Sequence, residues 1–161
     1  MKYRSIVVFA VVCAILMIAL AAAQAQDPSG PALGDTIDLT SFRSQKGQTL
    51  AEAIKGHSLA MIVLVSPNCD TCSLSKDGFK NLKAEVAQPG IPYFVLMISD
   101  GSDSAKYYSY ADSLKLGAES FVWSNAEAKP PISLASMAVP SHLMVTNEGL
   151  VVNKWLGAEA K

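Results

Sequence analysis

The chain is poor in cysteine, in charge and, beyond Arg43, in arginine. Its three cysteines are too few for the disulfide scaffold of a small secreted domain. Charged residues make up 17% of the sequence and are scattered without a basic cluster, so we expect no nucleic-acid partner. No cofactor-binding motif occurs either, and we therefore expect no cofactor.

The longest apolar run lies at the N-terminus. Lys2 and Arg4 precede an uncharged stretch from Ile6 to Ala23, and Ala23-Gln24-Ala25 has the small residues that a signal peptidase recognises. The stretch is long for a signal-peptide core and short for a membrane span. A signal peptide cleaved before Gln26 and an uncleaved membrane anchor both fit it, and the cleaved form is favoured.

This leader divides the chain into three parts. We expect residues 1–25 to be the signal peptide or membrane anchor, residues 26–33 to be a polar linker, and residues 34–161 to form a single domain. On either interpretation of the leader, the domain works outside the cytoplasm, in the periplasm or secreted.

Two of the three cysteines lie three residues apart, in Cys69-Asp70-Thr71-Cys72. The apolar run Leu59 to Val65 precedes them and a helical pattern starts near Ser73, so they lie at a strand-to-helix junction. A helix N-terminus stabilises a thiolate, which makes Cys69 the expected nucleophile and Cys72 the resolving thiol. A purely structural disulfide is the less favoured alternative, because a loop of two residues gives little entropic stabilisation.

The two residues between the cysteines, Asp70 and Thr71, are expected to tune the redox potential. Asp70 places a negative charge beside Cys69, which should raise the pKa of that thiol and disfavour the reduced form. We therefore expect a reductant, with a potential closer to about −250 mV than to about −120 mV.

Hydrophobic periodicity predicts alternating strands and helices. Strands are expected over 59–65, 91–99, 119–123, 143–146 and 150–156, the last two joined by a turn at 147–149. Helices are expected from a Thr49 cap to Gly56, from Ser73 to about Ala87, and from about Ser104, capped by Asp100 or Ser102, to Leu116. Short extended pieces over 34–49, a loop over 125–131 and one or two helical turns over 132–137 complete the pattern. A β-α-β unit followed by a hairpin predicts an α/β fold, with a mixed central sheet flanked by helices.

In the helix predicted from Ser73, the residues expected to face the core are Leu74, Gly78 or Phe79, Leu82 and Val86.

The only histidines, His57 and His142, raise the question of a metal site. With Cys69 and Cys72 they could form a Cys₂His₂ or copper site. Strand alternation more simply makes His142 a packed sheet residue and His57 a loop residue. We therefore assign no metal ligand.

A peroxidase centre of the peroxiredoxin type is not expected. That centre has proline seven residues before its cysteine, whereas Ile62 and Val65 stand at the corresponding positions before Cys69 and Cys72. It also uses an arginine far downstream, and none follows Arg43.

Taken together, these motifs resemble those of exported thioredoxin-like proteins. The closest resemblance is to the TlpA-type thiol-disulfide oxidoreductases and to the methylamine-utilisation disulfide protein. It rests on the segment from Ser66 to Cys72, on Val139-Pro140, on the turn Asn147-Glu148-Gly149 and on Gly34-Asp35 near the start.

The resemblance implies a thioredoxin-like fold in which Pro140, in the cis form, faces the CxxC pair. The backbone beside it, at Val139, would then pair with a substrate peptide as a strand does. The sequence departs from the pattern at Asn68, where a tryptophan is usual, and at Val63, where thioredoxins keep a buried acid.

A further departure lies at the C-terminus. Only residues 158–161 follow Gly157, where the family usually adds a helix, so we expect the fold to be short of its C-terminal helix. An uncovered sheet face around Leu150, Val152 and Trp155-Leu156 would then favour a homodimer.

The sequence thus predicts an extracytoplasmic thiol-disulfide oxidoreductase that acts on partner proteins, as a reductant supplied by a membrane electron donor. The alternatives are a copper or zinc carrier of the same fold and a maturation factor that serves a single client.

Overall fold

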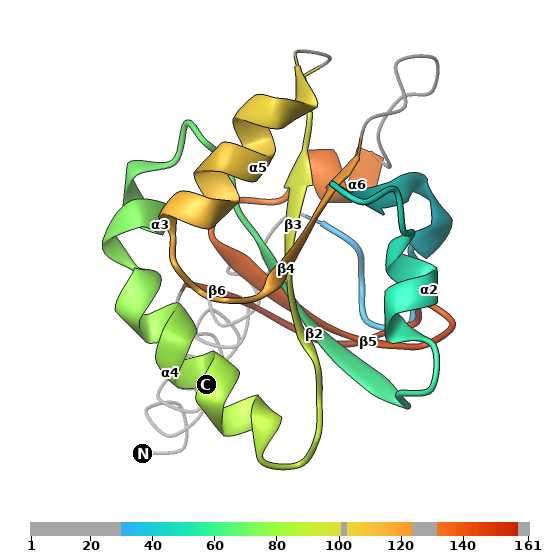
Figure 1. The fold of residues 1–161 in the computed structure, drawn as a ribbon. Helices are drawn as coiled ribbons and strands as arrows, with labels where there is room; N and C mark the ends of the chain where they lie inside the picture. Colours follow the sequence, from blue (N-terminus) through green and yellow to red (C-terminus); the bar gives the residue numbers. More distant parts are fainter. Residues whose placement is uncertain (1–29, 101–102, 124–131, 158–161) are drawn as a thin grey trace, which may run out of the picture.

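The computed structural model describes residues 30–100, 103–123 and 132–157 (Figure 1). The predicted signal peptide or anchor at 1–25, most of the linker at 26–33, the loop at 125–131 and residues 158–161 therefore lie outside the described residues. None of the helices in the described ranges has the length and apolar character needed to cross a membrane.

The described chain alternates helices and strands as the periodicity predicts. In order, the elements are the 3₁₀-helix η1 (Leu39–Ser41), β1 (Phe42–Ser44), α2 (Leu50–Ile54), β2 (Leu59–Leu64), α3 (Asp70–Leu74), α4 (Lys76–Ala87), β3 (Tyr93–Ile98), α5 (Ser104–Ser113), β4 (Glu119–Trp123), α6 (Ile132–Ala135), β5 (Ser141–Thr146) and β6 (Val151–Leu156).

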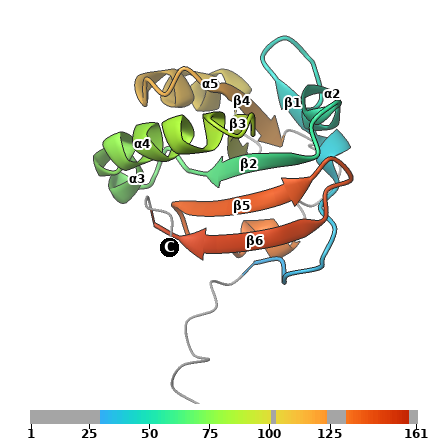
Figure 2. The ribbon, with the colours of Figure 1, turned by 90° about the horizontal axis from the view of Figure 1, so that it is seen from below.

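The strands form one sheet in the order β1-β4-β3-β2-β5-β6. The three central strands β4, β3 and β2 are parallel, whereas β1, β5 and β6 each pair antiparallel with a neighbour. Seen from below, β6 lies at the outer edge beside β5 (Figure 2). The mixed sheet with flanking helices confirms the predicted α/β fold.

Helices cover both faces of the sheet. In Figure 1, α3, α4 and α5 lie on one side, and α2 and α6 lie on the other. Each layer encloses its own cluster of buried side chains. Phe79, Leu82 and Tyr107 belong to the cluster under α4 and α5, whereas Leu50, Ile54 and Leu134 belong to the cluster under α2 and α6. Val139 is packed against both clusters.

The predicted cap of α2 is confirmed. The Thr49 hydroxyl accepts the N–H of Glu52, and the Glu52 carboxylate accepts the N–H of Thr49, which together make a capping box. For α5 the cap is Asp103, whose side chain accepts the N–H of Ala105, so the expectation of Asp100 or Ser102 is wrong.

The helix after the cysteines differs from the prediction in two respects. It begins at Asp70 instead of near Ser73, and it is interrupted at Ser75, where α3 ends and α4 begins. Leu74 was expected in the core but is 84% exposed. Five residues separate Leu74 from the buried Phe79, which places the two side chains about 140° apart around a helix.

The apolar residues of the last hairpin do not form one uncovered face. His142 pairs with Trp155 and Ser141 with Leu156, so Trp155 and Leu156 point to opposite sides of the sheet. Trp155 is partly buried under the α4 layer, where it stacks on His142, while Leu156 is 49% exposed. Leu150 and Val152 are 38% and 40% exposed, so the predicted exposure is confirmed for them and for Leu156 but not for Trp155, and the homodimer stays a prediction.

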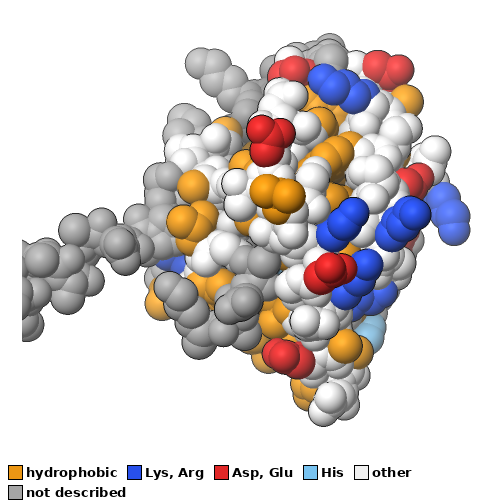
Figure 3. Space-filling model, turned by 90° about the vertical axis from the view of Figure 1, so that its left-hand side faces the viewer, with side chains coloured by type: hydrophobic (Ala, Val, Ile, Leu, Met, Phe, Trp, Pro, Cys, Tyr) orange, Lys and Arg blue, Asp and Glu red, His pale blue; other side chains and the backbone are white. Residues whose placement is uncertain are grey.

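The outer surface over α3 and α4 is mixed in character. Figure 3 shows lysine and arginine side chains gathered on one half of this face, with acidic side chains among them and small apolar areas beside them.

Candidate active site

Cys69 and Cys72 form a disulfide at the start of α3. Their Cα atoms are 5.3 Å apart. The strand β2, buried from Ala60 onward, ends at Leu64, and the turn through Ser66 brings the chain to Cys69, whose N–H donates to the carbonyl oxygen of Ser66 at 3.1 Å. The predicted strand-to-helix junction is thus where the structure places the pair.

Cys69 is the N-cap residue of α3. Its sulfur lies 3.0 Å from the backbone nitrogen of Cys72, whose N–H donates to it. The same N–H also donates to the carbonyl oxygen of Cys69 at 3.1 Å, so the sulfur shares this amide with the backbone. A thiolate at Cys69 would accept the same amide, so the structure supplies the stabilising contact that the sequence predicted.

The two cysteine residues differ in their exposure to solvent. Cys69 is 9% exposed, whereas Cys72 is fully buried. Both residues belong to the cluster of buried side chains under α4, and Cys69 is the one with some exposed area. The roles of Cys69 as nucleophile and Cys72 as resolving thiol stay predictions.

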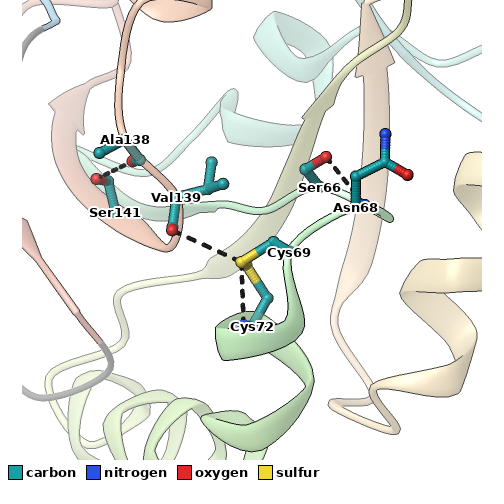
Figure 4. Close-up of a disulfide and its surroundings, with 7 residues drawn as sticks. All are labelled: Ser66, Asn68, Cys69, Cys72, Ala138, Val139 and Ser141. Carbon is teal, nitrogen blue, oxygen red and sulfur yellow. Dashed lines mark hydrogen bonds between the residues drawn. A yellow bond between two sulfur atoms is a disulfide. The ribbon is translucent and has the colours of Figure 1, made fainter.

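The Val139-Pro140 segment lies directly against Cys69 (Figure 4). The Val139-Pro140 peptide bond is cis, and the carbonyl oxygen of Val139 lies 3.6 Å from the Cys69 sulfur. The hydroxyl of Ser141 donates to the carbonyl oxygen of Ala138, and the N–H of Gly157 donates to the carbonyl oxygen of Pro140, so the loop is anchored on both sides. The structure therefore brings together the two segments that the sequence singled out.

Asp70 and Thr71 occupy the first two positions of α3, and both side chains are exposed. Asp70 is the one acidic residue in the first turn of this helix. Its charge therefore lies next to Cys69 along the chain, on the surface of the protein.

His142 lies in the core instead of at the site. Its ring is fully buried on β5, and both ring nitrogens have partners: Nε2 lies 3.0 Å from the Tyr93 hydroxyl and Nδ1 lies 2.9 Å from the carbonyl oxygen of Gly157. Only an Nδ1–H can bond to a carbonyl oxygen, which leaves Nε2 as the acceptor of the Tyr93 O–H. Burial lowers the pKa of His142 from 6.5 to about 4, because desolvation disfavours the charged ring.

The two hydrogen bonds of the His142 ring count against the alternative function of a metal carrier. Binding a metal through His142 would require the ring to break a buried hydrogen bond. Within the described ranges, no group of three or more histidine, cysteine, aspartate or glutamate side chains is placed to hold an ion. His57 lies apart, exposed, in the turn before β2.

A cavity of about 320 Å³ lies beside Ser66 and Val139, two residues that contact Cys69, and nothing in the sequence predicted it. Its wall combines the ends of β2 and β3 with α6 and the turn that follows α6. The contributing segments are far apart in the sequence, and no local pattern indicates that they meet. The carboxyl ends of parallel strands are where α/β folds commonly bind ligands, and this rule was the available signal.

Comparison with solved structures identifies the fold. A domain of a possible thiol-disulfide isomerase from Cytophaga hutchinsonii superposes with a TM-score of 0.60 at 13% identity, covering 81% of this chain and 88% of its own. A thiol:disulfide interchange protein from a Bacteroides species gives a TM-score of 0.62 at 14% identity, covering 80% of this chain and 84% of its own. The thioredoxin domain of a thiol-disulfide oxidoreductase from Bacteroides vulgatus gives 0.61 at 15%, covering 79% and 90%.

The fold is thioredoxin-like. No protein-family model matches the chain, and no curated protein matches it in sequence. The thioredoxin-like fold agrees with what the sequence resemblance implied, including the place of the CxxC pair and of the cis proline. At these identities the likeness concerns the fold, and the chemistry has to be argued from this chain's own residues.

Proposed function

We propose that this protein is an extracytoplasmic thiol-disulfide oxidoreductase that exchanges disulfides with partner proteins through Cys69 and Cys72. The observation that carries the proposal is the Cys69–Cys72 disulfide at the first turn of α3, with the more exposed cysteine beside Val139. The solved proteins of similar fold that carry thiol-disulfide names support the same chemistry.

The exchange proceeds in two steps. In the reduced protein, the Cys69 thiolate attacks one sulfur of a client disulfide; a bond forms between Cys69 and that sulfur, and the other client sulfur leaves as a thiolate that takes a proton from water. Cys72 then loses its proton and attacks the Cys69 sulfur, which forms the protein disulfide and releases the second client thiolate. The client gains two electrons and the dithiol loses two.

Two interactions in the structure favour the first step. The N–H of Cys72, which now faces the Cys69 sulfur, would stabilise the attacking thiolate. The backbone of Val139 lies beside Cys69, and pairing of an extended client segment with it would align the client disulfide.

The proposed direction is reduction of the client. Asp70, whose negative charge is next to Cys69, disfavours the thiolate and so favours the disulfide form of the protein, which is what a reductant requires. The electrons would come from a membrane donor that reduces the Cys69–Cys72 disulfide again. The predicted leader at residues 1–25 supports a location where such a donor could meet it.

A thiol-trapping titration tests the proposal. The purified protein is equilibrated in dithiothreitol redox buffers, and free thiols are counted by the mass shift on reaction with a maleimide. We expect a reversible two-electron couple between about −300 and −120 mV, nearer the negative end. Absence of a reversible couple would refute the oxidoreductase.

Single-cysteine variants separate the two roles. Cys72→Ser should accumulate mixed disulfides with clients through Cys69, because no resolving thiol remains to release them. Cys69→Ser is the matched control and should accumulate far fewer, since Cys72 is fully buried. Equal trapping by both variants would contradict the assignment of nucleophile and resolving thiol.

A further inference from the structure

The pairing of β5 with β6 extends one step further, to Pro140 and Gly157. Ser141 lies opposite Leu156, and beyond them the N–H of Gly157 donates to the carbonyl oxygen of Pro140 at 2.9 Å. In an antiparallel ladder, two residues bonded in this way normally exchange two hydrogen bonds. Proline has no N–H, so the second bond, to the carbonyl oxygen of Gly157, cannot come from Pro140.

The side chain of His142 provides a donor to that carbonyl oxygen. Its Nδ1 lies 2.9 Å from the carbonyl oxygen of Gly157, and its Nε2 lies 3.0 Å from the hydroxyl of Tyr93. Because a carbonyl oxygen only accepts, the proton is on Nδ1, and Nε2 accepts the Tyr93 O–H. Both backbone groups of Gly157 are therefore bonded, the N–H to Pro140 and the carbonyl oxygen to His142.

Packing fixes the ring of His142 in this orientation. The ring is fully buried and stacks on Trp155, with ring centroids 5.1 Å apart and an interplanar angle of 11°. The ring of Phe79 packs against it edge-on, with centroids 5.7 Å apart. Because this packing already orders the ring, its bond to Gly157 needs little further loss of conformational entropy.

The bonded pair of Pro140 and Gly157 lies next to the redox site. Val139 directly precedes Pro140, and its carbonyl oxygen lies 3.6 Å from the Cys69 sulfur (Figure 4). The bond from Gly157 to Pro140 is therefore one peptide unit away from the backbone that faces Cys69. A shift of Gly157 would move that backbone, with which an extended client segment would pair.

We infer that His142 is a positioning residue for disulfide exchange at Cys69. Its Nδ1–H makes the bond to Gly157 that Pro140 cannot make. It thereby holds the backbone of Val139 in place for pairing with an extended client segment. The inference rests on the proposed function, because it concerns the client of the same Cys69. A small disulfide that reacts at Cys69 without pairing with this backbone should not depend on His142.

Two disulfide reagents test this inference. One is the pentapeptide Ala-Ala-Cys-Ala-Ala joined through its cysteine to thionitrobenzoate, and the other is the symmetrical disulfide of thionitrobenzoate, which has no peptide backbone. With each, the Cys69 thiolate of the reduced protein bonds to one sulfur, and thionitrobenzoate leaves as a coloured thiolate. We expect His142→Leu to lower the second-order rate constant for the peptide about fivefold. The rate constant for the aromatic disulfide should stay within about twofold of wild type.

Asparagine in place of His142 should restore the peptide rate. The amide nitrogen of asparagine stands as many bonds from the backbone as Nδ1 of histidine, and it carries the N–H that the Gly157 carbonyl oxygen accepts. We expect the peptide rate constant of His142→Asn to lie within about twofold of wild type. A rate constant as low as that of His142→Leu would contradict the role of the Nδ1–H.

Tyr93→Phe is the matched control. It removes the other hydrogen bond of the same ring and keeps the bond from Nδ1 to Gly157. We expect Tyr93→Phe to be less stable than wild type, because Nε2 loses its buried donor, and to keep the wild-type ratio of the two rate constants. A ratio lowered as far as in His142→Leu would overturn the inference, because losing any buried bond of this ring would then have the same effect.

Nitrogen NMR of the imidazole tests the donor without a substitution. At neutral pH we expect Nδ1 of His142 to carry the proton and Nε2 to carry none, and a proton on Nε2 alone would overturn the inference. Failure of the wild-type protein to react with the aromatic disulfide would refute the proposed function. Reaction with that reagent, but an unchanged ratio of rate constants in His142→Leu, would refute the role of His142 alone.

Discussion

Asp70 is the first residue of α3 and directly follows Cys69, whose sulfur accepts an N–H at the start of the helix. Replacing it with proline removes the negative charge and keeps the helix start, because proline is well tolerated at the first helical position. We expect Asp70→Pro to move the redox potential by about 30 mV in the oxidising direction, a tenfold change in the equilibrium constant. Redox titration against Asp112→Asn, a remote exposed acid on α5, measures the difference. An unchanged potential would exclude Asp70 as a tuning residue.

His142 makes the stability of the fold depend on pH. Its folded pKa of about 4 lies below its usual 6.5, so the unfolded chain binds a proton more readily than the folded one. The contribution of neutral His142 to the free energy of unfolding is complete above about pH 6.5. It is lost as the pH falls toward 4, by about 3 kcal/mol in total. Hydrogen bonds from Ser41 and Thr40 lower the pKa of the Asp38 carboxyl. Its protonation therefore reduces the stability only at pH values below the range in which His142 titrates.

Urea unfolding at pH 7 and pH 4.5 measures this dependence. His142→Leu should be less stable than wild type at pH 7, because the Tyr93 hydroxyl loses its buried partner, and should show a smaller decline toward pH 4.5. His57→Leu, at an exposed position, is the control and should decline as the wild type does. A full decline in His142→Leu would assign the pH dependence to other groups.

At the scale of elements, the hairpin between β5 and β6 holds the N-terminal segment of the domain against the sheet. The N–H of Ile37 donates to the carbonyl oxygen of Gly149 at 2.9 Å, and Gly149 has a φ of +85°. A Cβ at Gly149 would overlap the carbonyl oxygen of Ile37, whereas Gly47, at a φ of +82°, has open space around the same position. The two glycines therefore share a backbone conformation and differ in their surroundings.

This pair gives a matched prediction. Gly47→Ala should cost about 1 kcal/mol, from the left-handed conformation alone. Gly149→Ala should cost at least about 2 kcal/mol more, because the backbone of the Ile37 segment must move away. Denaturant unfolding of both variants measures the difference, and equal costs would show that the Ile37 contact yields easily.

Some features of the strands and helices could be predicted from the sequence, and others could not. The runs around Ile62 and Val95 predicted central strands because both faces of those strands are buried, and the CxxC pair was correctly placed at a helix start. The place of β4 between β1 and β3 could not be predicted, because periodicity describes one segment and says nothing of its neighbours. The cavity was missed for the same reason, since its wall is assembled from three segments.

For the whole molecule, two tryptophans report on opposite faces of the sheet. Trp123 lies in the cluster under α2 and α6, and Trp155 packs against the cluster under α4, stacked on His142 with ring centroids 5.1 Å apart. A single small domain unfolds in one cooperative transition. Trp155→Phe and Trp123→Phe, each keeping one reporter, should therefore show fluorescence midpoints that coincide with the circular dichroism midpoint of the same variant. Separate midpoints would mean that the two layers unfold independently.

The sulfur of Cys69 both caps α3 and is the atom that would exchange bonds with a client. The amide of Cys72 therefore faces a disulfide sulfur in this structure, a thiolate after reduction and a mixed disulfide in between. A charged acceptor holds an amide hydrogen more tightly than a neutral one does. We therefore expect the hydrogen bond from the Cys72 N–H to the Cys69 sulfur to be stronger in the reduced protein than in the disulfide form. The chemical shift of the Cys72 amide proton in solution should therefore report the redox state of the protein.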